Sequence, residues 1–228
     1  MDAPAVIDFH THSLLSDGAL VPAELARRVQ VAGYRVLGLA DHVDHGTLEG
    51  TLIKARASAL ALNGSLGDLL VLPGVEITHV PPPLIGGLIA RARELGASHV
   101  VVHGESLAEP VAPGTNRAAI EAGADILAHP GLLSEEEAAL AAECGVYLEI
   151  SGRQGHCLTN GLVVKLARRQ GAKMLINSDG HAPGDFYNPG GQRAVALGAG
   201  LDDDEYLGLM RHAALLAETF RQRLYGPL

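Results

Sequence analysis

Short apolar runs, each ending at a carboxylate or an imidazole, recur along this chain. The runs are rich in Val, Ile and Leu, a composition typical of the buried strands of a parallel sheet. The polar residues at their ends are His10, Asp41, Glu76, His103, His129, Glu149 and Asp179. Because parallel strands end at a common edge, the pattern predicts that these side chains gather at the edge where α/β proteins do chemistry.

Segments with helical spacing separate the runs. They are predicted as helices over 22–32, 48–62, 84–95, 116–122, 138–144, 161–170 and 203–225. Pro22 suits a first helical position and Gly33 a stop. Ser134 and Glu137 form a capping-box pattern, and Gly145 ends the helix that follows.

Seven strands that alternate with seven helices through short connections predict a (β/α)7, TIM-like barrel. At 228 residues the chain is long enough for one well-buried domain and short for two, so residues 1–228 are interpreted as a single domain. Segments 80–83 and 182–191 are expected to be ordered loops on the active face.

Composition limits the classes of molecule that this protein is expected to bind. The formal net charge of −9 argues against a nucleic-acid-coating surface, so a nucleic-acid polymer is not an expected partner. Residues 1–4 contain no basic segment and no apolar stretch reaches about 18 residues, so we expect neither a signal peptide nor a membrane span and take a cytoplasmic location as the default. Cys144 and Cys157 are too few for a disulfide framework.

The candidate chemistry begins at His10-Thr11-His12. Residues two apart in an extended segment point the same way, so both imidazoles can hold one ion. One His-x-His is weak evidence, but so many polar groups at one barrel mouth would be costly unless metals paired them. Imidazoles and carboxylates without thiolates suit Zn²⁺, Mn²⁺ or Fe²⁺ and argue against an all-oxygen Ca²⁺ or Mg²⁺ site.

Taken together, the motifs resemble those of the PHP (polymerase and histidinol phosphatase) family, in order over nearly the whole chain. The matching motifs are His10-Thr11-His12, Ser16-Asp17-Gly18, Ala40-Asp41-His42, Gly74-Val75-Glu76, His103, Ala128-His129-Pro130 and Ser178-Asp179-Gly180-His181. The resemblance implies a distorted (β/α)7 barrel and two to three divalent ions. One ion would take His10, His12, Glu76 and Asp179, a second Glu76, His103 and His129, and a third Asp17, His42 and His181. Glu76 would bridge the first two.

Other polar residues have less specific interpretations. Asp41 either orients the neighbouring imidazole of His42 from outside the coordination sphere or caps a strand end. Arg153 is the first choice for binding phosphate, because a guanidinium meets phosphate through two hydrogen bonds. Arg193 and Arg117 follow it. The histidines outside the motifs are not expected to be ligands; they are His45, His79, His99, His156 and His212, with His45 and His156 the strongest candidates for contacting substrate.

The leading functional hypothesis is a metal-dependent phosphoesterase that hydrolyses a small phosphomonoester, histidinol-phosphate-like or nucleotide-like, through a metal-activated hydroxide. One alternative is a metal-dependent amidohydrolase, which Glu76 as a bridge and the additional group of Asp17, His42 and His181 disfavour. Another is a non-catalytic metal-binding module, as PHP domains attached to DNA polymerases can be, which the complete motif set disfavours. The sequence leaves the substrate, the metal at each position and the oligomeric state open.

Overall fold

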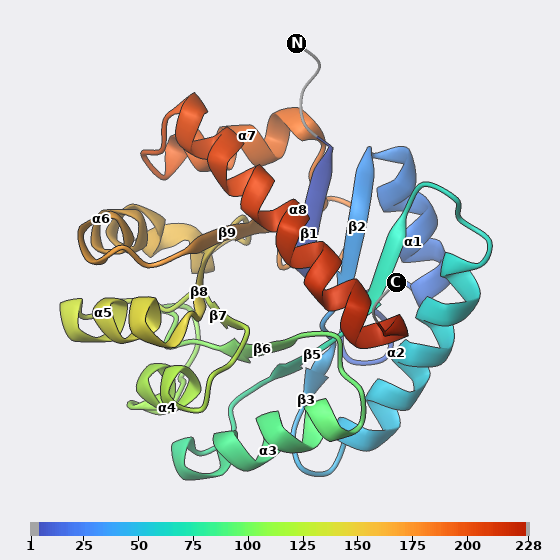
Figure 1. Ribbon diagram of the computed structural model, residues 1–228, viewed down its shortest axis with the longest axis horizontal. Coiled ribbons are helices and arrows are strands. Elements are labelled where there is room, and N and C mark those ends of the chain that lie inside the picture. Colours follow the sequence, from blue (N-terminus) through green and yellow to red (C-terminus); the bar gives the residue numbers. More distant parts are fainter. Residues whose placement is uncertain (1–4, 227–228) are drawn as a thin grey trace.

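The computed structural model describes residues 5–226, the side chain of Pro189 excepted (Figure 1). Its strands are β1 (Val6–Thr11), β2 (Tyr34–Leu39), β3 (His42–Val43), β4 (Leu70–Pro73), β5 (Val75–Ile77), β6 (Val100–His103), β7 (Ile126–Ala128), β8 (Tyr147–Ser151) and β9 (Met174–Asn177). Its helices are α1 (Pro22–Val31), α2 (Leu48–Asn63), α3 (Pro82–Glu94), α4 (Thr115–Glu121), α5 (Glu135–Cys144), α6 (Asn160–Gln170), α7 (Pro189–Gly198) and α8 (Asp203–Tyr225), with a short 3₁₀ helix η1 (His156–Thr159). The model is therefore a mixed α/β structure with alternating elements, as predicted.

The strands form two parallel sheets, ordered β1-β2-β4 and β3-β5-β6-β7-β8-β9. β3 and β5 continue the second and third predicted strands beyond a break in each. Backbone hydrogen bonds cross these breaks, from Gly74 N–H to the Leu39 carbonyl (2.8 Å) and from Glu76 N–H to the Asp41 carbonyl (3.1 Å). All seven predicted strands are present, and two of them are each divided into two shorter ones.

The predicted closed barrel is not confirmed. The first and last strands lie next to each other, but within residues 5–226 a single isolated parallel bridge, between Thr11 and Gly180, joins their ends. At the rest of this seam a side chain replaces part of the ladder, because the Asn177 amide oxygen accepts from the Phe9 N–H at 3.0 Å. The strands follow a barrel-like order without a continuous hydrogen-bonded ring among the described residues.

The seven predicted helices are present with ends shifted by three residues or fewer. The capping box is confirmed: Glu137 N–H donates to Ser134 Oγ at 3.1 Å, and Ser134 N–H donates to the Glu137 carboxylate at 2.9 Å. α7 and η1 were not predicted. The segment 182–191 was expected to be a loop, but α7 begins within it, where Asn188 accepts from Gly191 N–H. Three glycines in α7 obscure its helical pattern, since glycine disfavours helix interiors.

α8 covers one end of the sheets and leaves the other end free. It lies against β1, β4 and β9 (Figure 1). Phe220 packs edge-on against Phe9 with ring centroids 5.2 Å apart, and Arg223 donates to the carbonyl of Ser98, just before β6. α8 therefore closes the amino-terminal ends of the strands, and the carboxyl-terminal ends face the βα loops. None of the described helices combines the length and the apolarity that crossing a membrane requires.

Candidate metal centre

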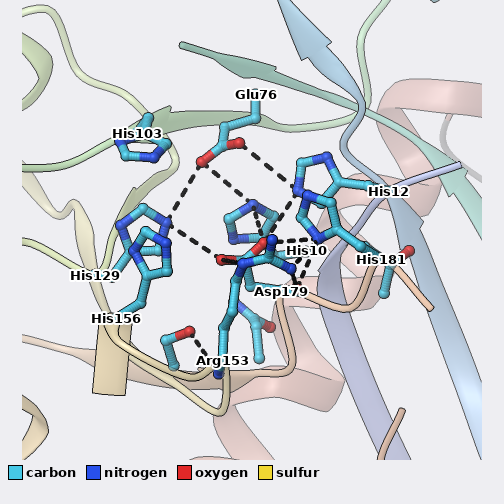
Figure 2. A network of polar contacts seen from close by, with 12 residues as sticks. His10, His12, Glu76, His103, His129, Arg153, His156, Asp179 and His181 are labelled. Atoms are coloured by element: carbon cyan, nitrogen blue, oxygen red, sulfur yellow. Dashed lines mark hydrogen bonds and ion pairs between the residues drawn. The ribbon is translucent and has the colours of Figure 1, made fainter. Parts of the chain in front are cut away.

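Nine side chains that the sequence singled out converge at the carboxyl ends of the strands, and Figure 2 labels seven of them. They come from the β1 end and the loop after it, from β3, β5 and β6, and from the residues that follow β7 and β9. These residues are His10, His12, Asp17, His42, Glu76, His103, His129, Asp179 and His181. The structure brings all nine together, and their assignment as ligands stays a prediction.

Glu76 lies at the centre of the cluster. Its Oε1 atom is 3.3 Å from His10 Nε2 and 3.7 Å from His129 Nε2. Its Oε2 atom is 2.6 Å from His42 Nδ1 and 3.7 Å from His12 Nε2. One fully buried carboxylate thus contacts imidazoles from each of the three predicted ion groups, which is the arrangement that a bridging ligand requires.

The potential ligand atoms form several overlapping groups, and the atoms of each group all lie within 4.8 Å of one another. The third predicted set is present with one more member, as His12, Asp17, His42 and His181. The first set appears as His10, His12 and Asp179, and His10 also joins His129 and Glu149. The second set appears as His103 and His129 together with His156, which the sequence motifs did not include. A further group at the solvent side comprises His79, His103 and Glu109.

Burial favours the neutral form of three predicted ligands, His12, His103 and His129, and the neutral form is the one that binds metal ions. Burial lowers the pKa of His12 well below its ordinary value, and the nearby His42 adds to this; burial likewise lowers the pKa of His129. His10 and His42 differ. Glu149, Glu76 and Asp179 together outweigh the burial of His10 and raise its pKa, and Glu76 outweighs the burial of His42 and raises its pKa. Burial opposes ionisation of Glu76, but His10 and His42 overcome it and hold the Glu76 pKa well below the usual range.

Several buried nitrogen and oxygen atoms of the cluster have no hydrogen-bond partner. They include both ring nitrogens of His12, Nε2 of His10, Nδ1 of His129 and Oε1 of Glu76. Leaving one such group unsatisfied costs about 1–3 kcal/mol, so five of them together would strongly destabilise the fold without a ligand. Divalent transition-metal ions bound by imidazole and carboxylate would satisfy these atoms. The residues therefore fit a metal centre.

Backbone strain marks the same region. His79, His129 and Asp179 are the non-glycine residues with positive φ among the described residues, at 53°, 27° and 52°. Such conformations each cost on the order of 1–3 kcal/mol and cluster at functional sites. Two of the three, His129 and Asp179, are predicted ligands that lie within two residues of a strand end. In these backbone conformations the side chains of His129 and Asp179 point into the cluster, where their nearest polar atoms are 3.5 Å apart.

Other groups contact the cluster imidazoles from outside. Glu149 Oε2 lies 2.8 Å from His10 Nδ1 and accepts from the Asn177 amide at 2.9 Å. Thr78 Oγ1 lies 2.7 Å from His42 Nδ1, which fixes the orientation of that ring. Such partners set which nitrogen of a histidine remains free for a metal. Glu149 was recognised in the sequence as a strand-end residue but not as a partner of His10.

Asp41 contacts a loop. Its carboxylate accepts hydrogen bonds from the backbone and side chains of Ser13 and Ser16, at 2.8–3.1 Å. These bonds hold the turn that leads into Asp17. The described hydrogen bonds of Asp41 include none to His42. Its position is thus closer to the strand-end-cap interpretation than to the imidazole-orienting one.

The three candidate arginines lie in different places. Arg153 reaches the cluster: its Nη1 lies 2.6 Å from His181 Nδ1 and donates to the Asp179 carbonyl at 3.2 Å. Arg193 instead pairs with Asp203 through two contacts of 2.7 Å on the exposed surface. Arg117 pairs with Glu121, one turn further along α4. Of the three, Arg153 is the one the structure brings to the cluster.

Three residues that the motifs missed, His79, Glu109 and His156, lie beside the outer imidazoles of the cluster. Glu109, in the loop between β6 and α4, lies 2.9 Å from His79 Nε2, 3.3 Å from His103 Nε2 and 3.5 Å from His156 Nε2. It lines a cavity of about 30 Å³, enough for about one water molecule. The cavity is lined by Asp17, His42, His103, Glu109, Arg153, His156, Asp179 and His181. No strand-end pattern marks Glu109, because it lies six residues beyond β6.

The fold and the cluster define a class: a parallel α/β protein with a histidine- and carboxylate-rich candidate metal centre at the strand ends. No protein-family model matches the chain. The chain belongs to the same family as the uncharacterized protein MJ1295 of Methanocaldococcus jannaschii. The two are 43% identical over 206 residues, which cover 90% of this chain and 94% of that protein.

Two other relatives have named activities or assemblies. Ribonuclease P protein component 3 of Methanosarcina mazei is 29% identical over 223 residues, covering 91% of this chain and 86% of that protein. The 3',5'-nucleoside bisphosphate phosphatase of Chromobacterium violaceum is 38% identical over 108 residues, covering 41% of this chain and 38% of that protein. Relatives of this chain thus include a phosphatase and a ribonucleoprotein component.

Solved structures share the fold. A chain in the cryo-EM structure of archaeal Ribonuclease P with mature tRNA matches with a TM-score of 0.69 at 18% identity, covering 97% of this chain and 94% of that one. The putative histidinol phosphatase of Listeria monocytogenes matches with a TM-score of 0.55 at 12% identity, covering 79% and 97%. The Ribonuclease P relatives conflict in part with the expectation that a nucleic-acid polymer is not a partner.

Proposed function

We propose that this protein is a PHP-type, metal-dependent phosphoesterase that hydrolyses small phosphomonoesters. The observation that carries the proposal is the position of Glu76, one buried carboxylate within 3.7 Å of four imidazoles that belong to three predicted ligand groups. A shared carboxylate between adjacent cations is what a multinuclear hydrolase site needs. The similarity to a bisphosphate phosphatase supports the choice of phosphate esters.

Two to three Zn²⁺, Mn²⁺ or Fe²⁺ ions fit the donor set. His10, His12 and Asp179 with Glu76 would hold one ion, His103 and His129 with Glu76 a second, and Asp17, His42 and His181 a third. When bound, such ions supply positive charge that makes a water molecule more acidic and stabilises the phosphoryl oxygens. The negative charge of Glu76 would offset the repulsion between two such cations.

The protein's own groups then bind and orient the ester. Arg153 reaches the cluster from the loop after β8, and its guanidinium can donate two hydrogen bonds to phosphate. The buried walls around His10 and Glu76 exclude bulk water, which strengthens each electrostatic contact. Because the cavity is only about 30 Å³, a phosphate ester must displace half-exposed lining residues such as Glu109.

A second candidate function is a non-catalytic subunit of an RNA-containing assembly, which the full-length similarity to Ribonuclease P component 3 favours. Surface charge argues the other way. Many exposed arginines are paired with carboxylates, as in Arg35 with Asp68, Arg168 with Glu205 and Arg169 with Glu135. Arginines paired in this way contribute little net positive potential for a polyanion.

A substrate panel separates the two functions. The protein, loaded with Mn²⁺ or Zn²⁺, is assayed against phosphomonoesters, cyclic phosphates, amides and single-stranded oligonucleotides, and its binding to structured RNA is titrated over a salt series. We expect turnover of small esters to exceed oligonucleotide cleavage by a wide margin. Tight RNA binding with no turnover of any ester would favour the assembly function, and amide hydrolysis alone would favour an amidohydrolase.

A further inference from the structure

We propose that His156, from the 3₁₀ helix η1, is a direct ligand of the ion at His103 and His129. This would complete one ion position with three imidazoles. The inference rests on the metal-binding part of the proposed function and is independent of the substrate. One nitrogen of His156 lies within 4.8 Å of a nitrogen of both other histidines. Metal–imidazole bonds of about 2.0–2.1 Å join nitrogens up to roughly 4 Å apart, so small side-chain rotations would bring the three onto one ion.

The surroundings of His156 point to an ion. Its side chain is 4% exposed, and its Nδ1 atom is buried without a hydrogen-bond partner. The ring centroid lies 4.1 Å from that of His129, whose Nδ1 is also buried and unpartnered (Figure 2). An ion enclosed beside the ring would satisfy a buried nitrogen such as His156 Nδ1.

The chain fixes His156 in this place. Gly155 precedes η1 with a φ of +87°, a conformation that side chains rarely adopt. Residues 152–159 form a loop between β8 and α6. At the base of this loop, the Asn160 side chain accepts from the Ser151 N–H at 3.2 Å and donates to the Ser151 carbonyl at 2.8 Å. The loop is thus clamped between β8 and α6. A clamped ligand loses little conformational freedom when an ion binds.

Burial distinguishes this ion position from the one at Asp17. His103, His129 and His156 are 2%, 1% and 4% exposed, while Asp17 is 55% exposed. Both positions offer three imidazoles, so burial is what distinguishes them, and an ion at the Asp17 position lies closer to solvent. The His103–His129–His156 position should therefore release its ion last.

The experiment compares wild-type protein with His156→Gln, and with His45→Gln as a matched control at an exposed histidine. Each protein is stripped with a chelator and titrated with Zn²⁺ against a chromophoric competitor. We expect His156→Gln to weaken the Kd of the tightest-bound ion at least about tenfold. The remaining ions and the control should be unchanged. Thermal unfolding of the stripped proteins reports whether the variant folds.

Two results would overturn the inference. One is an unchanged number and affinity of ions in a folded His156→Gln. The other, which needs no variant, is X-ray absorption of wild-type protein with one equivalent of Zn²⁺ that shows fewer than three imidazoles. Failure of the proposed function looks different. Wild-type protein that binds no ion would remove the metal centre itself, and absence of ester turnover would leave the zinc titration intact.

Discussion

The two ends of the parallel strands both bury histidine side chains, and the hydrogen bonding of those side chains differs. At the amino end, His99 packs between aromatic rings, its Nε2–H donates to the Phe9 carbonyl at 2.8 Å, and its Nδ1 lies 2.9 Å from Ser98 Oγ. At the carboxyl end, His12 is equally buried and neither ring nitrogen has a partner. Burial alone therefore does not indicate function, but burial without partners indicates a missing ligand.

The cavities show the same contrast. A cavity of about 480 Å³ lies at the amino end, beside Arg35, Asn63 and Tyr225. Its polar groups are paired with one another, since Arg35 binds Asp68 at 2.9 Å and Asn63 binds Tyr225 at 2.8 Å. The cavity at the carboxyl end is far smaller but is lined almost entirely by ionisable groups. The candidate site is therefore identified by its buried polar atoms without hydrogen-bond partners, and cavity volume does not identify it.

Removal of the metal ions should have the largest effect on stability. It changes the carboxyl end of the strands and leaves the amino end as it is. An ion present at 100 times its Kd stabilises the folded state by about 2.7 kcal/mol, so two ions contribute roughly 5 kcal/mol. For a chain of this size we expect chelation to lower the Tm by roughly 10–20 °C. Calorimetry with elemental analysis checks this. Fewer than one bound ion per chain, with no change in Tm, would refute the metal centre.

Glu76→Gln should be next in size. It removes the negative charge shared by two ion positions while almost preserving side-chain volume, so we expect turnover to fall by about 10²-fold or more and metal content to decrease. His99→Gln is the control, a change at a buried but hydrogen-bonded residue of the other end. Equal, small losses in both variants would mean that Glu76 is not the bridge.

Acid should destabilise the amino end through His99, whose pKa burial lowers to about 4. Between pH 6.5 and 4 the unfolded chain binds a proton that the folded chain rejects. The buried, neutral His99 therefore makes its full contribution to the free energy of unfolding above pH 6.5. That contribution is lost as the pH falls toward 4, and the loss is roughly 2 kcal/mol at pH 5.

The stripped protein isolates this effect. We expect the drop in Tm from pH 7 to pH 5 to be about 4–8 °C smaller in His99→Gln than in wild type. Asp8, whose pKa burial raises to about 6, acts in the opposite direction in both proteins and cancels from the difference. Identical pH profiles would show that His99 does not carry the acid sensitivity.

Arg153→Ala should give the smallest effect. The arginine contacts the rim of the cluster, so its removal should raise the KM for a small phosphate ester by roughly tenfold, or about 1.4 kcal/mol, without changing metal content. Arg193→Ala and Arg117→Ala are matched controls, since each arginine is paired with an acidic residue elsewhere. The assignment fails if all three variants have the same KM.

The sequence predicted most of the elements and the convergence of the strand-end residues. Runs of Val, Ile and Leu gave the strands, and α8 has the predicted bounds, 203–225. The convergence of His10, Glu76 and His129 follows from one rule, because parallel strands end at a common edge. α7 was missed, since local glycine content hides a helix that is stabilised by packing.

The sequence by itself determined which residues could supply ligands and the order in which the chain presents them. Only the tertiary structure decided their surroundings. It placed His156 beside His129 and Glu109 over His103, from loops whose course no local pattern records. It made Glu149 the hydrogen-bond partner of His10 and Asp41 the partner of Ser13 in the loop after β1. The partner of a carboxylate depends on which strands are neighbours. Periodicity is local physics, whereas hydrogen-bond satisfaction is a property of the assembled fold.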